Sequence, residues 1–168
     1  QENKPTFDVA CSDQVTLEGL RQLQKGRHLA VSVETDARIA RIGEARLIGL
    51  ANENHPTSMI FDLNNLPETM REQLAKLHSS DQVKVAYDWS EVGPLLINAG
   101  FSLGGMMFDA LLAAQLLKSG IPGSCPGITT MVASLLDVLD PSLDRDNHWH
   151  GPLVQGQYRR AAARVDVL

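Results

Sequence analysis

The sequence alternates between short apolar runs and longer segments with helical periodicity, and this alternation limits the folds open to the chain. Residues 28–34 and 83–86 are mostly apolar runs of strand length. Between them, residues 67–77 place Met70, Leu74 and Leu77 on one helix face, after a proline suited to a first helical turn. Strands that alternate with amphipathic helices are typical of an α/β protein.

The same order extends in both directions along the chain. Further strands are predicted at residues 6–11, 46–51 and 58–61, with 52–57 as a turn. A helix that starts at Ser12 or Asp13 is predicted to end at Gly26. Its apolar positions are Val15, Leu17, Leu20 and Leu23. Gly104-Gly105 reads as a turn before a short strand, and Asp109 as the cap of a helix over 110–118. Residues 128–139 form another predicted helix, and 119–127 and 141–151 are loops.

Three segments carry polar residues at strand and helix ends in a fixed order. Ser32-x-Glu34 ends the strand over 28–34. Asp88 and Val92 follow the strand over 83–86, ahead of the run from Phe108 to Leu117. Arg160-x-x-x-Arg164 lies in the last segment, from Trp149 to Leu168.

In order, spacing and surrounding aliphatic residues, these segments resemble the 3′–5′ exonuclease domain shared by ribonuclease D and the proofreading part of family A DNA polymerases. That family places Asp-x-Glu on the first strand, Asn-x-x-x-Asp on the next helix and Tyr-x-x-x-Asp on a late helix. The resemblance covers about residues 7–168. It implies an α/β fold of the ribonuclease H-like type, a mixed β-sheet flanked by α-helices.

The sequence departs from the family at most of the metal-binding positions. Ser32, Val92 and Arg164 stand where three of the four carboxylates belong, and Arg160 replaces the tyrosine. Only Glu34 is retained, and Asp88 occupies the asparagine position. Such enzymes cleave a phosphodiester with two divalent ions, which need oxygen ligands. We therefore expect no catalytic residues, no metal site and no cofactor; Mg²⁺ or Mn²⁺ would matter only if residual activity persisted.

An alternative register shifts the last motif by two residues and puts Asp166 in the acidic position and Ala162 in the tyrosine position. Two residues turn a helical side chain by about 200°, so Asp166 is expected to face away from the site. The gapless register, which also aligns Pro152-Leu153 and Gln157, is preferred. Asp36 and Glu91 are further acids near the motifs, and we interpret both as solvated surface residues.

The loss of metal ions has an electrostatic consequence. Clustered carboxylates repel one another until cations neutralise them. A fold without the ions must therefore lose or neutralise that charge, and an arginine pairs well with carboxylates. We predict that Arg164 forms a salt bridge to Glu34 or Asp88.

The net charge of −5 and the pI near 5.5 argue against a nucleic-acid site spread over the whole surface. A local basic patch is the alternative, built from two arginine clusters that flank one cleft. The residues of this predicted nucleic-acid site are Arg38, Arg41, Arg46, Arg159 and Arg160. Surface ion pairs with the 20 acidic residues would explain the same arginines equally well.

Among degenerate relatives, the pattern is most similar to the exonuclease-domain-containing protein 1 group of animals. That resemblance implies a catalytically inactive, RNA-binding adaptor in piRNA biogenesis, a form of RNA silencing. It also implies a protein partner and, in some cases, a homodimer. A cytoplasmic location is expected separately, because reduced thiols are the default reading of the chain's two cysteines. Single-stranded RNA is the expected ligand, and DNA stays open.

Two other functions remain open from the sequence. One is a weak 3′–5′ exonuclease that recruits Asp88, Glu91 or Asp166 as metal ligands. The other is the vestigial proofreading domain of a family A polymerase. A polymerase domain further along the chain would favour the vestige, and a small β-barrel before this domain would favour the adaptor.

The chain of 168 residues is expected to be a single domain over 1–168, taken from a longer protein. No apolar run reaches the roughly 20 residues of a membrane span, and no leader pattern opens the chain. Cys11 and Cys125 form no metal or redox motif. His148-Trp149-His150 is weak support for a metal site, because no further ligand clusters with it.

Overall fold

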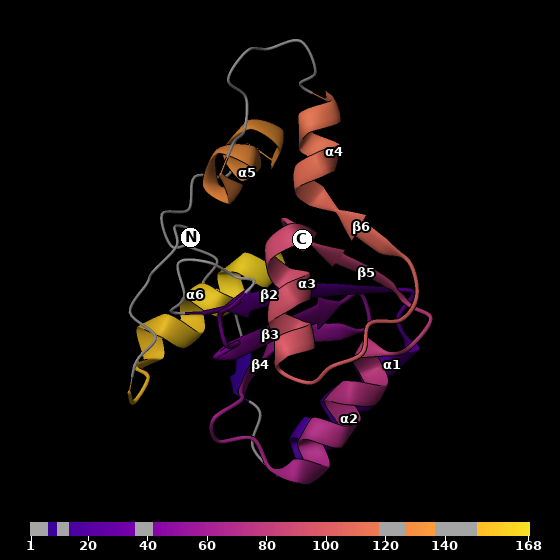
Figure 1. Cartoon of the computed structure of the whole chain (residues 1–168), viewed down its shortest axis with the longest axis vertical. Coiled ribbons are helices and arrows are strands. Elements are labelled where there is room, and N and C mark those ends of the chain that lie inside the picture. The colour runs from indigo at the N-terminus through magenta and orange to yellow at the C-terminus, as the bar shows by residue number, and fades with distance from the viewer. Residues whose placement is uncertain (1–6, 10–13, 36–41, 118–126, 137–150) are drawn as a thin grey trace.

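The computed structural model describes residues 7–9, 14–35, 42–117, 127–136 and 151–168. Within these residues, six strands form one mixed sheet in the order β1-β4-β3-β2-β5-β6 (Figure 1). The β2–β3 and β3–β4 pairs are antiparallel, and the β1–β4, β2–β5 and β5–β6 pairs are parallel. The strands are β1 (Phe7–Val9), β2 (His28–Glu34), β3 (Leu47–Asn52), β4 (His55–Asp62), β5 (Val83–Ala86) and β6 (Met107–Asp109).

Helices cover both faces of this sheet (Figure 1). One face packs against the first three helices, whose buried leucines meet the odd-numbered residues of β2. The opposite face carries α6, where Ala161 and Ala162 contact Leu47 and Ile60. The described helices are α1 (Gln14–Lys25), α2 (Glu68–His78), α3 (Trp89–Asn98), α4 (Ala110–Leu117), α5 (Ile128–Leu136) and α6 (Gln155–Asp166).

The predicted alternation of strands and helices is confirmed, with two local corrections. β4 begins at His55 rather than at residue 58, because the Asn52 side chain accepts hydrogen bonds from the backbone N–H groups of Asn54 and His55 and tightens the turn. On α1, Leu20 and Leu23 are buried as expected, but Leu17 is exposed. Thr16 takes its place in the buried stripe.

Glycine allows α6 to lie close to the sheet at Gly49 of β3. Gly49 pairs with Ser32 across the sheet, and a Cβ atom at position 49 would lie 2.5 Å from the Ser32 Oγ and 3.3 Å from the Ala161 carbonyl oxygen. No such atom fits without a shift of Ser32 or of the helix. Gly49 therefore fixes the distance between the sheet and the helix that carries the last motif.

We expect Gly49→Val to lower the free energy of unfolding by about 1–3 kcal/mol, because the added side chain overpacks this contact. Chemical denaturation measures the change. Gly156→Ala is the matched control, since a Cβ atom there meets nothing within 4 Å and alanine favours the helix. Equal stability of the wild type and Gly49→Val would show that α6 does not rest on Gly49.

Two ionisable side chains lie inside the core on the face opposite α6. The Lys84 ammonium donates hydrogen bonds to the carbonyl oxygens of Ser80 at 2.7 Å and Gly104 at 2.8 Å. His78 is fully buried, with its ring centroid 5.2 Å from that of Phe101. Burial lowers the pKa of Lys84, and Asp81 partly offsets this effect.

No helix in the described part of the chain is long and apolar enough to span a bilayer.

Candidate functional site

The three sequence motifs meet where β2 and β5 end. Glu34 is the last residue of β2, and Asp88 follows the neighbouring parallel strand β5. The carboxyl ends of two parallel neighbours share one edge of the sheet, so the motifs on both strands reach the same region. α6 packs across β2 on the sheet face that carries Ser32 and brings Arg164 to Glu34 (Figure 1).

Arg164 and Glu34 form a salt bridge. The Arg164 Nη1 atom lies 3.4 Å from the Glu34 Oε2 atom. The Glu34 side chain is 2% exposed and that of Arg164 is 16% exposed, so water screens the pair only weakly. The predicted ion pair is therefore confirmed, with Glu34 rather than Asp88 as the partner.

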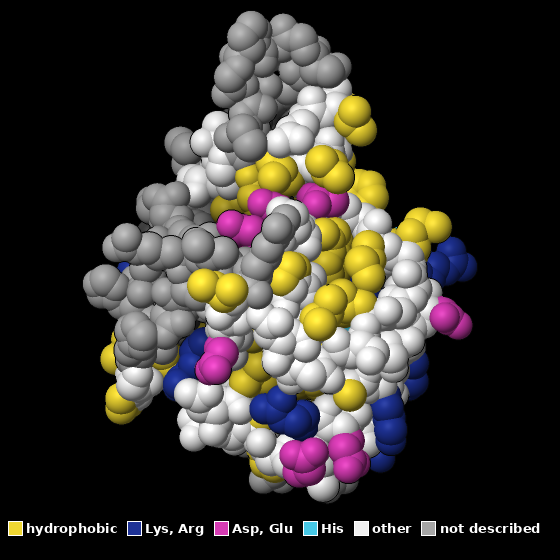
Figure 2. All heavy atoms as spheres, viewed as in Figure 1, with side chains coloured by type: hydrophobic (Ala, Val, Ile, Leu, Met, Phe, Trp, Pro, Cys, Tyr) yellow, Lys and Arg dark blue, Asp and Glu magenta, His cyan; other side chains and the backbone are white. Residues whose placement is uncertain are grey.

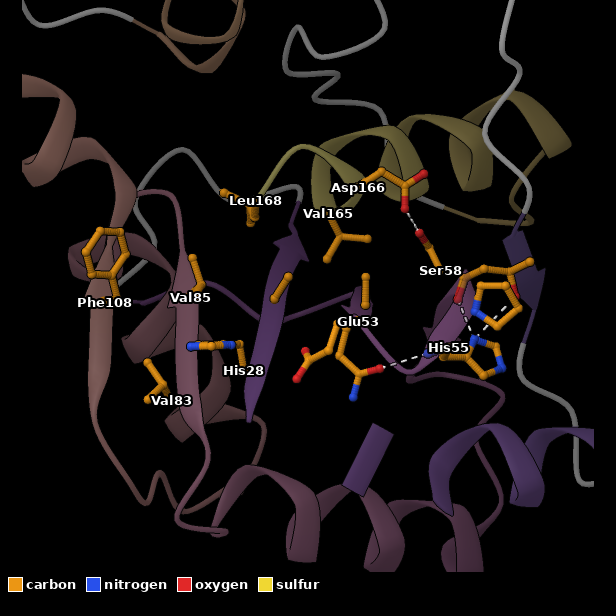
Figure 3. Close-up of a pocket in the computed structure, with 15 residues that line it drawn as sticks. His28, Glu53, His55, Ser58, Val83, Val85, Phe108, Val165, Asp166 and Leu168 are labelled. Carbon is orange, nitrogen blue, oxygen red and sulfur yellow. Dashed lines mark hydrogen bonds between the residues drawn. The ribbon is translucent and has the colours of Figure 1, made fainter. Parts of the chain in front are cut away.

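Asp166 belongs to a different part of the molecule. Its carboxylate accepts a hydrogen bond from the Ser58 hydroxyl on β4, and Figure 3 shows the two side chains pointing toward each other. Desolvation raises the pKa of Asp166 to about 6, although part of the residue faces water. The alternative register is therefore wrong for this helix, because it is Arg164 that faces Glu34.

Ser32 and Val92, the other two positions at which the family pattern predicts carboxylates, are buried and supply no anionic ligand. Ser32 is 7% exposed, and its hydroxyl donates a long hydrogen bond of 3.5 Å to the Ala161 carbonyl of α6. Val92 is 6% exposed and packs in the core beneath α3. Neither side chain offers the negative oxygen that a hard divalent ion requires.

Asp88 has a structural task at the start of α3. It adopts the left-handed conformation with φ of 64°, and its Oδ1 atom accepts hydrogen bonds from the Ser90 N–H and hydroxyl groups at 3.1 and 2.5 Å. Asp109 holds the same turn by accepting from the N–H groups of Asp88 and Trp89. Asp109 also accepts from the Leu111 N–H at 2.9 Å, which confirms its predicted role at the start of α4.

The predicted arginine clusters are only partly placed by the structure. Arg46 turns to Asp62, with its Nε atom 3.1 Å from Oδ1 and its Nη2 atom 3.2 Å from Oδ2. Both side chains of this ion pair are nearly buried, at 13% and 8% exposed. The Arg46 Nη2 group also donates a hydrogen bond to the Gly151 carbonyl, so this guanidinium is directed toward the protein, and its place in the predicted nucleic-acid site stays a prediction.

Arg159 and Arg160 are exposed on α6, and Arg38 and Arg41 lie outside the described residues, as does Asp36. On the face of the molecule in Figure 2, basic side chains are scattered among acidic ones and form no continuous patch. A basic site on this face is therefore a local one. The His148-Trp149-His150 segment also lies outside the described residues.

Sequence reasoning missed a cavity of about 630 Å³ on the α6 side of the sheet (Figure 3). Its lining includes Ala30 of β2, Val85 of β5 and Phe108 of β6, together with Val165 and Leu168 near the end of the chain. These residues come from segments far apart in the sequence, so no single motif could reveal the cavity. Nor could spacing reveal the Arg46–Asp62 pair, which joins the residue before β3 to the last residue of β4.

No protein-family model and no curated protein sequence matches the chain. Solved structures do match. Trypanosoma brucei RNase D in complex with RNA U12 superposes with a TM-score of 0.79 at 20% identity, over 98% of this chain and 60% of that one. Escherichia coli RNase D, an exoribonuclease, superposes with a TM-score of 0.74 at 20% identity, over 96% of this chain and 42% of that one. The Aedes aegypti Nibbler EXO domain superposes with a TM-score of 0.75 at 19% identity, over 99% of this chain and 84% of that one.

The fold is therefore the ribonuclease H-like fold of the DEDD 3′–5′ exonucleases, as predicted from the sequence. The chain spans less than two thirds of the length of the RNase D structures.

A metal pair of the kind that such exonucleases use does not fit the residues of this site. Within the described ranges, no group of three histidine, cysteine, aspartate or glutamate side chains could hold a metal ion. Arg164 presents a permanent cation to Glu34, the carboxylate that the family pattern retains. A divalent ion at Glu34 would be repelled by this guanidinium or would have to displace it. We therefore derive no catalytic step through a metal.

Proposed function

We propose that this domain is a catalytically inactive 3′–5′ exonuclease fold that binds single-stranded RNA and serves as an adaptor. The observation that carries the proposal is the buried Arg164–Glu34 ion pair, which joins two positions at which the family pattern has metal-binding carboxylates. Loss of the ligand oxygens at Ser32 and Val92 supports the same conclusion.

RNA as the ligand class is supported by the neighbours. T. brucei RNase D with the same fold is in complex with RNA U12. In this chain, Arg159 and Arg160 stand exposed on the helix that borders the site. The adaptor role, its place in piRNA biogenesis, a protein partner and a homodimer are further parts of the proposal, and they rest on the resemblance of the sequence motifs. A cytoplasmic location is also proposed, on the reading of the two cysteines as reduced thiols.

The purified domain should leave single-stranded RNA and DNA intact in Mg²⁺ or Mn²⁺, because two-metal cleavage lacks its ligands. End-labelled oligonucleotides resolved on a denaturing gel provide the measurement. Time-dependent shortening from the 3′ end, abolished by Glu34→Ala, would show instead that the domain is a residual exonuclease.

Binding of RNA should be weak and strongly dependent on salt, because a few arginines compete with counterions for phosphates. We expect Arg160→Glu and Arg41→Glu to weaken binding. Each lost phosphate contact should lower the slope of log affinity against log salt by roughly 0.7. Lys76→Glu is the matched control, since it makes the same charge change at an exposed position on α2, across the sheet from α6. Fluorescence anisotropy at several salt concentrations measures both quantities.

Absence of binding at low salt would contradict the RNA-binding proposal and favour a structural module, such as a vestigial proofreading domain. An equal loss of affinity in Lys76→Glu and Arg160→Glu would show that total charge, and not the α6 surface, controls the association.

A further inference from the structure

The former catalytic positions are covered as well as chemically altered. Ser32, Glu34 and Val92 are 7%, 2% and 6% exposed, and the Arg164 side chain is 16% exposed. The Ala161 carbonyl of α6 lies 3.5 Å from the Ser32 hydroxyl, so the helix backbone rests directly on the first motif. The positions at which the family pattern has metal-binding carboxylates are therefore largely closed to a ligand.

A 3′–5′ exonuclease must bring a strand end to its metal ions, so its reaction requires a site that admits that end. In this chain the Arg164 guanidinium is already paired with Glu34. The Val92 side chain is apolar and can make no polar contact with a phosphate. The neighbouring Arg46–Asp62 pair is likewise neutralised within the protein. A strand end that entered this region would have to break a buried ion pair, which is strongly unfavourable.

In the described part of the chain, solvent-exposed arginines near this region lie further out on α6. Arg160 is one helical turn from Arg164 and shares its face of the helix, so it stands at the outer border of the closed region. Arg159 is exposed beside it. Arginine contacts to a phosphate backbone are made equally well anywhere along a strand.

We infer that the domain binds single-stranded RNA along its backbone, at internal positions, and requires neither a free 3′ end nor a divalent ion. The inference rests on the proposed RNA binding and specifies its mode. Arg164 is the specificity-determining residue of this binding mode, because its ion pair with Glu34 excludes the strand end.

The covering of the former catalytic region can be tested without RNA. In a background of Cys11→Ser and Cys125→Ser, Ser32→Cys adds one nearly isosteric thiol under α6, and Arg159→Cys adds one on the exposed surface. A small thiol reagent should modify the cysteine at position 32 about tenfold more slowly or slower still, because access requires local opening of α6. Comparable rates in two variants of equal melting temperature would overturn the inference.

The inferred end-independent binding of RNA is tested with linear and circular oligouridylate of the same length, in EDTA. The two forms should bind with affinities within about twofold of each other, since backbone contacts do not depend on a strand end. Binding of the linear 3′-hydroxyl form alone, or binding that needs Mg²⁺, would overturn end-independent binding while leaving RNA binding intact. No association of either form at low salt would contradict the proposed function itself, together with this inference.

Discussion

Replacing Arg164 by Asp should lower the free energy of unfolding by about 3 kcal/mol or more, because it leaves Glu34 buried without its cation and adds a second carboxylate beside it. For a domain of this size, such a loss corresponds to a fall in melting temperature of roughly 6–12 °C. Thermal unfolding followed by circular dichroism measures it. The variant is also expected to remain without nuclease activity, since Ser32 and Val92 still supply no ligands.

Two further variants separate the ion pair from general effects of the substitution. Arg159→Asp makes the same exchange at an exposed position of the same helix and should change the stability far less. Adding Glu34→Gln to Arg164→Asp should recover part of the lost stability, because it removes one of the two adjacent negative charges. An unchanged melting temperature in Arg164→Asp would show that the site is held together in another way.

Stability should also fall by about 3 kcal/mol as the pH drops from 6.5 to 4, because His78 is buried as the neutral imidazole. Burial, and next the charge of Lys84, lower the pKa of His78 from 6.5 to about 4. Within the described part of the chain, neither ring nitrogen has a hydrogen-bond partner. The unfolded chain binds the proton first, so this contribution is complete above pH 6.5 and is lost as the pH falls through 4.

His78→Phe tests the source of this pH dependence. Phenylalanine can keep the ring contact with Phe101 and does not titrate, so the variant should lose most of the decline in stability below pH 6.5. His28→Phe, at an exposed position at the start of β2, is the control and should keep the decline. Urea denaturation between pH 4 and 8 gives the curves, and an undiminished decline in His78→Phe would exclude His78 as the cause.

Asp166 contributes to the pH dependence with the opposite sign. Its raised pKa means that the folded protein binds the proton more tightly than the unfolded chain. This contribution is present below pH 3.8 and is lost as the pH rises through about 6. The carboxyl group is partly in water, so solvent screening makes its effect smaller than that of His78.

The sequence predicts most of the fold because local patterns determine most of its elements. The apolar spacing of Met70, Leu74 and Leu77 places them in the core as expected, and Asp109 caps α4 as expected. The Arg164–Glu34 contact was also predictable. A site that holds no metal ions needs another positive charge to neutralise its remaining carboxylate, and an arginine can supply it.

Features that depend on contacts between distant segments were not predictable in this way. Arg46 looked like a surface cation, yet it pairs with Asp62 because the antiparallel pairing of β3 and β4 brings their ends together. Lys84 is the one charged residue in the mostly apolar run over 83–86. Its ammonium is buried because three backbone carbonyls, from Ser80, Gln82 and Gly104, surround it in the fold. No spacing rule relates residues such as these.

Under the proposed function, the ion pair and the metal ions of the family pattern are alternative ways to neutralise the same region of the fold. In the first, a guanidinium held by one carboxylate supplies a fixed charge that cannot activate water. In the second, exchangeable divalent ions supply both charge and chemistry. The buried pair in this chain corresponds to the first.

Diffraction from crystals soaked in Mn²⁺, recorded at the manganese absorption edge, tests most directly whether Arg164 stands in for metal ions at Glu34. We predict no anomalous density within coordination distance of Glu34, and the Arg164 guanidinium still in contact with that carboxylate. A manganese ion bound by the Glu34 carboxylate, with Arg164 turned out to solvent, would contradict the replacement of the metal ions by arginine.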